Sequence, residues 1–565
     1  MWKESLRETH GPVFELFRHF LLRFFDSDLI TAKEHTPAAV VGAVAVLMQW
    51  MFIFIQPLKM KYEHFSGLGA PAPYREALRA DELWLITLMM SAIGLLTAIK
   101  WQSLFPGLRD YRALASLPLR PGQVFVAKLL ALLTVFAAVV MVLNLLPGLA
   151  FPAVSAGRWA FRPSLGGRVL AHMAACVAGS YFFFFALVAL EGVLLNLLRP
   201  RVFRRVTGSL QGFLVAATLV ILVLSFSIQP QIANAAVERN VARWLPPVWF
   251  LGLYQTLAGD PDQAMHQLAR WALAAMAAAV VLTVATYAIS YIRRRTLLVE
   301  ETAAGSKNRR RPGAILEWLV PNPRQQAVIA FTWKTLAYSS QHRMILMAYG
   351  GFGMAILLTG MLGAGRVFDP SRAIAARFAA GHVILLVFLL IGLRHLFSLP
   401  TELGANWMFR ITEREGRRDW MRALDRVILF SGAAAMVAIP FPAEAMLLGW
   451  RAVAEAVLFI AFGLLCYEWA FSSWEKLPFT CSYLPGKTPA WIVALELVAL
   501  LVALPIVSGV MVACLYNWLA YVGVIAVLVT VWSRVHAVRR ETWGQVRLQY
   551  EEFPDPDIHG LGLLQ

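Results

Sequence analysis

The chain has 565 residues, of which 59% are hydrophobic and only 15% are charged, and its formal net charge is +17. Soluble domains are less apolar and carry about 25% charged residues, so this composition excludes an ordinary soluble protein. The basic residues lie mostly between apolar segments, where they suit membrane topology and contact with anionic lipid headgroups. We therefore expect the lipid bilayer, and no nucleic acid, as a partner.

Twelve apolar segments are long enough to be transmembrane helices, because crossing the hydrocarbon core takes about 20 mostly apolar residues. The first six are 37–56, 83–99, 125–149, 169–198, 206–228 and 271–292. The last six are 344–362, 379–399, 427–447, 449–471, 491–513 and 515–535. The pattern predicts an all-α polytopic integral membrane protein with about 12 transmembrane helices.

The basic residues also predict the orientation of the chain. If the N-terminus is cytoplasmic, 37 of the 51 Lys and Arg residues fall in cytoplasmic segments. Loops rich in Lys and Arg stay inside, so both termini are expected in the cytoplasm. Six spans on either side of a basic linker further predict two tandem six-helix halves, an internal repeat of layout.

This layout predicts five regions. They are an N-terminal amphipathic cytoplasmic segment (1–36), a first membrane half (37–292), a basic cytoplasmic linker with an amphipathic helix (293–343), a second membrane half (344–535) and a cytoplasmic tail (536–565). An amphipathic stretch precedes each half. Phe14, Phe17 and Leu21 recur at helical spacing before the first span, as Ile329 and Leu336 do before the seventh.

The connection between the second and third spans is the most informative segment. Leu114 and Leu117 fall on one face of a short helix, and Pro118 ends it. A short helix held at the membrane surface by two spans can pass force between a soluble partner and the bilayer. The alternative is an interfacial loop whose charged side chains reach into water.

This connection resembles that of ABC-2-type ABC exporter permeases, which carries an acidic residue, a leucine-rich turn ending in Leu-Pro and a lysine entering the third span. The resemblance implies a coupling helix that docks on a cytoplasmic ABC ATPase, with ATP bound by that partner and no cofactor in this chain. The candidate coupling residues are Asp110, Arg112, Leu114, Leu117, Pro118 and Lys128. The second half has an amphipathic connection with a different residue order, and its candidates are Glu402, Asn406 and Arg410.

The family also has an enlarged external segment between its fifth and sixth spans, which here corresponds to 229–270. Its aromatic and proline residues suit re-entrant helices, and an aromatic belt at the membrane interface is the alternative. The candidates are Trp244, Pro246, Pro247 and Trp249.

Charged residues inside spans are also candidates for function, because burying a charge in lipid is costly. They are Glu191, Arg394, Glu455 and Glu496, and a snorkelling side chain or a buried ion pair is the alternative for each. His172 and His382 each open a span without a metal ligand at suitable spacing. We therefore expect interfacial histidines and no metal site.

The sequence predicts neither an enzyme nor an ATP site. The nearest P-loop match ends in Gly-Lys-Thr at 486–488 but has Cys481 in place of the first glycine. The predicted function is therefore the permease subunit of an ABC-type exporter in the plasma membrane, the inner membrane in a bacterium. The resemblance implies a hydrophobic or amphipathic substrate, which no residue identifies.

Two other classes of protein remain open. A major-facilitator-like secondary transporter has the same 6+6 layout, but its connection between the second and third spans is shorter. A membrane enzyme or a scaffold is the third class, and it would need a cluster of catalytic residues that the sequence does not display.

Overall fold

The structure is a computed structural model. It describes residues 11–21, 55–68, 71–105, 121–157, 159, 164–226, 244–260, 262–300, 320–362, 370–401, 406–428, 440–471, 474, 476–480, 490–543 and 548. These residues form helices, turns and bends, without a strand among them. The chain divides into two compact units, Met1–Ser306 and Lys307–Gln565.

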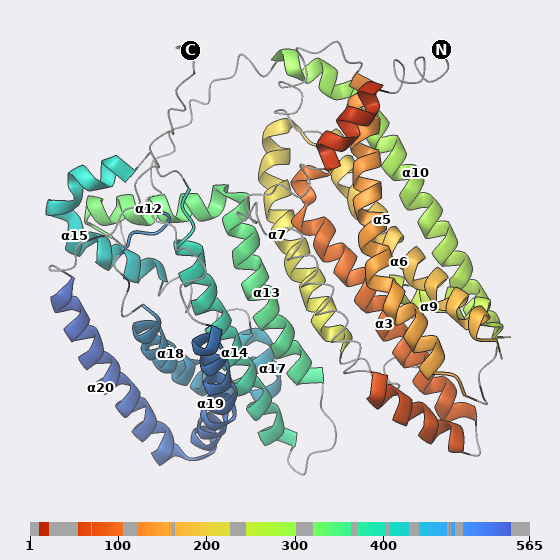
Figure 1. Cartoon of the computed structure of the whole chain (residues 1–565). Coiled ribbons are helices and arrows are strands. Elements are labelled where there is room, and N and C mark those ends of the chain that lie inside the picture. Colours follow the sequence, from red (N-terminus) through yellow and green to blue (C-terminus); the bar gives the residue numbers. More distant parts are fainter. Residues whose placement is uncertain are drawn as a thin grey trace, which may run out of the picture. The chain divides into compact units, whose positions relative to one another are not determined.

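The first unit is a bundle built around α6 (Figure 1). The labelled helices are α3 (Pro71–Ile99), α5 (Pro121–Val154), α6 (Leu165–Leu197), α7 (Pro200–Ser225), α9 (Pro246–Ala258) and α10 (Gln263–Glu300). Helices 11–21 and 55–67 precede α3, and the short 3-10 helix η1 (Trp101–Ser103) follows it. The central helix α6 contacts α3, α5, α9 and α10, while α7 packs on α3.

The second unit is a bundle around α14. Its helices are α12 (Pro323–Tyr338), α13 (Ser340–Leu362), α14 (Pro370–Phe397), α15 (Asn406–Ile428), α17 (Phe441–Leu448), α18 (Arg451–Ala470), α19 (Ala490–Tyr516) and α20 (Trp518–Thr542). In α13 and α14, Gly353, Gly381 and Gly392 lie so close to the facing helix that a Cβ atom at any of them would meet its side chains. Such small residues let membrane helices approach closely.

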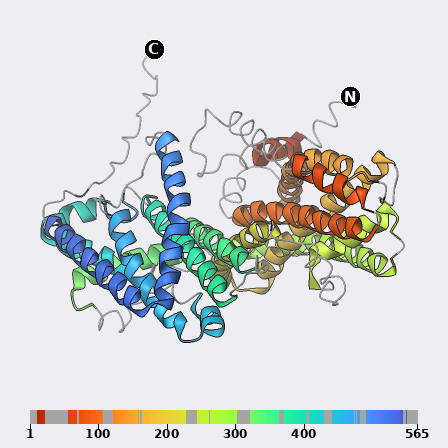
Figure 2. The ribbon, with the colours of Figure 1, turned by 90° about the horizontal axis from the view of Figure 1, so that it is seen from below.

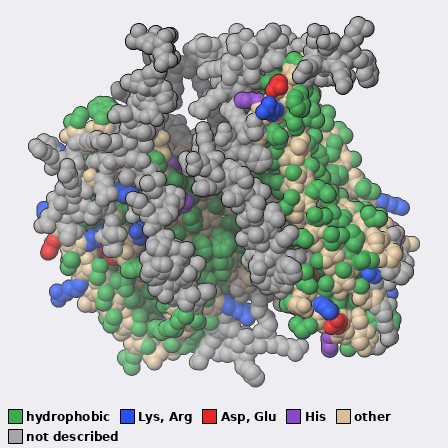
Figure 3. Space-filling view, in the orientation of Figure 1, with side chains coloured by type: hydrophobic (Ala, Val, Ile, Leu, Met, Phe, Trp, Pro, Cys, Tyr) green, Lys and Arg blue, Asp and Glu red, His purple; other side chains and the backbone are tan. Residues whose placement is uncertain are grey.

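Nine helices in the described part of the chain are long and apolar enough to cross a membrane. Hydrophobic side chains cover the flanks of the long helices on the face shown in Figure 3. Val281 on α10 and Val527 on α20 are among the many large apolar side chains that are exposed. Such an apolar surface is compatible with contact with lipid rather than water. The chain is therefore an all-α polytopic membrane protein.

The nine helices correspond to the expected second to eighth, tenth and twelfth spans. Most of the first expected span (37–56) lies outside the described residues, as do 429–439 of the ninth. The eleventh falls on α19, and Asn517 separates it from α20. The Asn517 side chain accepts hydrogen bonds from the backbone amides of Leu519 and Ala520, which caps the new helix.

The long helices of each unit lie side by side, and Figure 2 shows the same bundles turned by 90°. Within the second unit, α12 and α15 pack against each other at one end of the bundle. Trp474 and Phe479, from the segment after α18, belong to the same apolar cluster as Ile329 and Leu424. This end of the unit is therefore a packed layer of amphipathic helices.

Candidate functional site

Lys128 is the one coupling candidate of the first half whose side chain the structure describes. It lies on α5 with only 8% of its surface exposed, and its Nζ donates a hydrogen bond to the carbonyl oxygen of Phe105 at 3.1 Å. The same Nζ lies 5.3 Å from the centre of the Phe20 ring. Phe105 is the last described residue before 106–120, so Lys128 joins the two sides of that connection.

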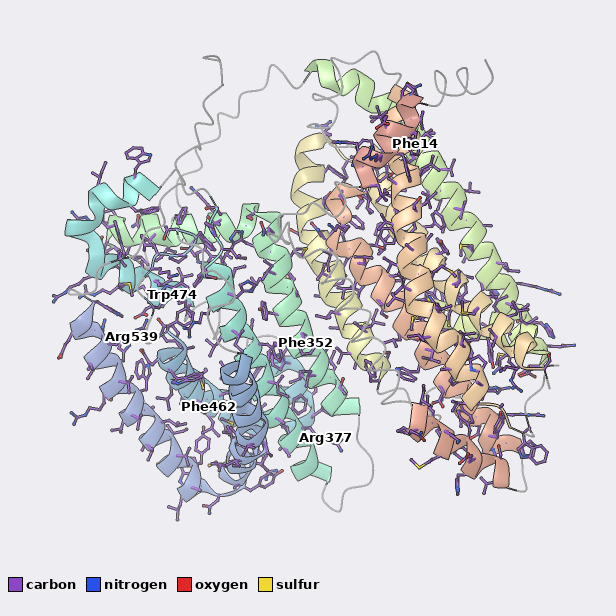
Figure 4. The ribbon with its side chains drawn as sticks, viewed as in Figure 1. Phe14, Phe352, Arg377, Phe462, Trp474 and Arg539 are labelled. Atoms are coloured by element: carbon purple, nitrogen blue, oxygen red, sulfur yellow. The ribbon has the colours of Figure 1, made fainter. Side chains whose placement is uncertain are left out.

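Helix 11–21 packs on α5 beside this lysine. Leu16 and Phe20 are buried against Val124 and Ala127, whereas Phe14 is exposed at the surface (Figure 4). The helix therefore buries one apolar face on α5, but Phe14, which the sequence pattern groups with Phe17 and Leu21, lies outside that face.

The remaining coupling candidates are less completely placed. Five residues of the first half, Asp110, Arg112, Leu114, Leu117 and Pro118, lie outside the described residues, and so does Glu402. Asn406 begins α15 and Arg410 lies in its second turn, but the structure describes neither side chain. Along the same helix, the side chains of Trp407 and Ile411 are exposed.

The four aromatic and proline candidates surround the start of α9. Trp244 is 83% exposed, and Pro246 and Pro247 form the first turn of the helix, where a missing backbone N–H costs little. Trp249 is partly buried, with its ring 6.0 Å from that of Phe182 on α6. The rest of α9 is buried between α6 and α10.

A tight turn connects α9 to α10. Gly259 ends α9 with a φ of +89°, a left-handed conformation that glycine adopts without strain. Gly252, two turns earlier, faces the backbone of α10 near Met265 and Ala269. The two helices therefore form a close hairpin held by glycines at both positions.

The four charged candidates inside spans have different environments. Glu191 is buried on α6, and Glu455 is fully buried on α18. Arg394 on α14 donates a hydrogen bond from Nη1 to the carbonyl oxygen of Ala470 at 2.9 Å. Glu496 lies in α19, and its side chain is not described.

His172 is buried in a polar cluster of the first unit. It is 1% exposed, and its Nδ1 lies 2.8 Å from Oε1 of Glu82 on α3. Cys176, one turn further along α6, places its Sγ 3.7 Å from Nε2 of His172. Sequence spacing missed the cluster because Glu82 is 90 residues away from His172.

His382 is buried in the same way in the second unit, at 2% exposure. Its Nε2 lies 3.1 Å from Oε1 of Glu444 on α17, and its Nδ1 lies 3.8 Å from Oε1 of Glu455. Phe459 packs on the imidazole with a centroid distance of 4.4 Å. The histidine comes from α14, and the two carboxylates come from the consecutive helices α17 and α18.

An ion-pair network connects α15, α18 and α20 of the second unit. Arg539 on α20 contacts Glu468 on α18 at 2.8 Å and Asp425 on α15 at 3.5 Å (Figure 4). Tyr467 donates a hydrogen bond to Asp425, and His536 Nδ1 lies 2.5 Å from Glu468. Burial raises the pKa of Asp425, and the nearby Arg539 guanidinium opposes that shift.

No protein-family model, curated protein or solved structure matches this chain.

Proposed function

We propose that this chain is the multi-pass permease subunit of an ABC-type exporter in the plasma membrane, resembling the ABC-2 class and working with separate cytoplasmic ATPase subunits. The observation that carries the proposal is the contact of Lys128 with Phe105 and Phe20. It fixes both ends of the connection that contains the Leu-Pro motif against helix 11–21. ATP would bind to the partner subunits, so this chain needs no cofactor and no catalytic residues.

A connection that transmits force needs stiff attachments, and the start of this one has them. Trp101, Leu104 and Phe105 are buried after the end of α3. Tyr287 of α10 donates a hydrogen bond to the Leu104 carbonyl, and its ring stacks on Phe105 at 4.3 Å. A push on the connection would therefore reach α3, α5 and α10 together, as rigid-body rocking of a bundle requires.

The corresponding region of the second half is α15, and it suits a second contact with the ATPase. Its C-terminal half is held by the contact between Asp425 and Arg539 and by packing on α12. Its N-terminal half exposes Trp407 and Ile411, two large apolar side chains on an otherwise highly charged helix. An exposed aromatic and aliphatic pair beside charges is a common anchor for a protein partner.

One observation favours the alternative of a secondary transporter. The cluster of His382, Glu444 and Glu455 is buried within the bundle, and buried titratable groups mark ion pathways in many transporters. We weigh it below the Leu-Pro connection, because a buried cluster can also serve structure or ion binding without a gradient.

The proposal is tested by purifying the tagged chain in a mild detergent and assaying the eluate for a co-purified P-loop ATPase. We expect the double change Leu114→Glu and Leu117→Glu to release the ATPase, because it places charge on the docking face. The matched control Leu114→Met and Leu117→Met keeps that face apolar and should retain the partner.

A parallel variant, Trp407→Glu with Ile411→Glu, tests the second half. Partial loss of ATPase would assign a contact to α15, and full retention would leave the first connection as the coupling site. If the wild-type chain brings down no ATPase and instead moves a solute along an ion gradient in liposomes, the exporter assignment is wrong and the secondary transporter replaces it.

A further inference from the structure

We propose that His382, Glu444 and Glu455 form a binding site for a divalent transition-metal cation of the Zn²⁺ class. The three side chains come from α14, α17 and α18, and one ligand atom from each lies within 4.8 Å of the other two. All three residues are buried. Imidazole nitrogens and carboxylate oxygens are both zinc ligands, and a site with three protein ligands keeps a fourth position open.

The cluster lacks the internal hydrogen bonds that a purely structural polar cluster has. Glu455 is 0% exposed, yet neither of its carboxylate oxygens has a hydrogen-bond partner in the described part of the chain. Nδ1 of His382, the atom nearest to Glu455, has none either. Buried polar groups without partners are rare and costly, so these atoms point to a bound species.

The charge of the cluster indicates what that species is. Among the described residues, no Lys or Arg forms an ion pair with Glu444 or Glu455. Arg451, one turn before Glu455 on α18, instead lies over the ring of Tyr516 at 4.5 Å. Two carboxylates and a neutral imidazole carry the charge that one divalent cation balances.

The ligand atoms lie near the spacing of a metal site, and a side-chain rotation would complete it. Ligand atoms about 2.0–2.2 Å from a tetrahedral zinc ion are roughly 3.3–3.6 Å apart. Nε2 of His382 lies 3.1 Å from Oε1 of Glu444, close to that range. The 3.8 Å contact of Glu455 is with the other ring nitrogen, Nδ1, so a metal bound to one nitrogen requires one of the two carboxylates to rotate towards it. The Phe459 ring against His382 restricts the imidazole to an orientation between the two carboxylates.

The first unit provides a comparison within the same molecule. Glu82, His172 and Cys176 are also buried and close together, but both oxygens of Glu82 lie within 3.0 Å of His172 Nδ1. That pair satisfies its own polar atoms. The metal is therefore assigned to the second cluster alone.

Metal binding would also fix the position of α17. This eight-residue helix joins α18 through Gly449, whose φ of +60° makes a sharp turn. A cation shared by Glu444, His382 and Glu455 would tie α17 to α14 and α18 at once.

The test measures metal content and affinity on the full-length protein purified in detergent and stripped with a chelator. We expect the wild type to take up one Zn²⁺ per chain, and Glu455→Gln and Glu444→Gln to lose that ion. Glu82→Gln, the same change in the other cluster, should keep it. Size-exclusion profiles recorded without metal establish whether each variant is folded.

Co²⁺ in place of Zn²⁺ identifies the ligands by absorption even if a variant fails to fold. Co²⁺ bound to His382, Glu444 and Glu455 should show ligand-field bands and no thiolate charge-transfer band. Co²⁺ bound to the first cluster would show a thiolate charge-transfer band, because Cys176 supplies a sulfur ligand. The inference is overturned if the wild type binds no stoichiometric metal, if folded Glu455→Gln binds as tightly as the wild type, or if the Co²⁺ complex shows thiolate charge transfer.

Discussion

Replacing Gly252 with larger residues should open the hairpin of α9 and α10. A Cβ atom at this position would lie 2.8 Å from the carbonyl oxygen of Met265 and 3.0 Å from the backbone nitrogen of Ala269, and would also collide with Leu268. Two of these three neighbours are backbone atoms, which cannot rotate away as a side chain can. The helices must therefore separate to accept the substitution.

The expected loss of stability is the difference between the cost of steric overpacking and the gain in helix propensity. Extra methyl groups in a close-packed interior cost about 1–3 kcal/mol, and occasionally more. Replacing glycine in a helix recovers up to about 1 kcal/mol of propensity with alanine and less with valine. We expect Gly252→Val to lose about 2–3 kcal/mol, and Gly252→Ala to lie between it and the wild type.

Cys176 reports this opening, since it belongs to the apolar cluster that contains Phe250 and Leu251 of α9. With the other three cysteines changed to serine, a loss of about 2–3 kcal/mol in local stability should accelerate maleimide labelling of Cys176 by roughly 30- to 150-fold. Gly523→Val on α20 is the control, because a Cβ there meets nothing within 4 Å. Labelling of Gly252→Val at the wild-type rate, or equal acceleration by Gly523→Val, would refute the reasoning.

Three further predictions concern the charged contacts. Lys128→Met should loosen helix 11–21 by about 1–3 kcal/mol and speed tryptic cleavage at Arg18, while Lys128→Arg should largely protect it. Arg539→Met should cost about 3–5 kcal/mol in detergent unfolding, because it removes the guanidinium that balances two buried carboxylates. Adding Glu468→Gln should restore part of that loss, and an additive double variant would contradict the pairing. Burial raises the pKa of Asp425, so the folded wild type takes up a proton at higher pH than the unfolded chain and gains stability as the pH falls through that pKa. Asp425→Asn should lack this gain when unfolding is followed over a pH series from neutral down to the ordinary value of 3.8, and parallel pH dependences would contradict it.

Hydropathy predicted the long helices because lipid-facing and protein-facing side chains are both apolar. It placed the start of the second span at residue 83, whereas α3 begins at Pro71. The extra turns contain Tyr74, Asp81 and Glu82, which face other protein segments and find polar partners there. Polar side chains of this kind lower the hydropathy averaged over neighbouring residues, so the predicted span starts too late.

The buried polar clusters also could not be predicted from the sequence. His382 was recognised as opening a span and Glu455 as a charged residue within one, but nothing in their spacing relates them. They meet only because α14 and α18 pack together, and α17 brings Glu444 to the same place. Glu444 sits in a short segment that hydropathy merges with a full span, so its position at a helical turn could not be predicted.

For the proposed coupling segment, the sequence is more informative than the described structure. The Leu-Pro motif lies outside the described residues, and only its boundaries, Phe105 and Lys128, are defined by contacts. Lys128 was expected to belong to the coupling surface, and in the structure it is buried and contacts Phe105 and Phe20.

The length of α9 constrains how this protein can be made. Thirteen helical residues extend about 20 Å, which is too short for a hydrocarbon core about 30 Å thick. During synthesis α9 leaves the ribosome before α10, its closest packing partner. We therefore expect α9 to reach its fully buried position only after α10 has been made, although α3 and α6 are already present.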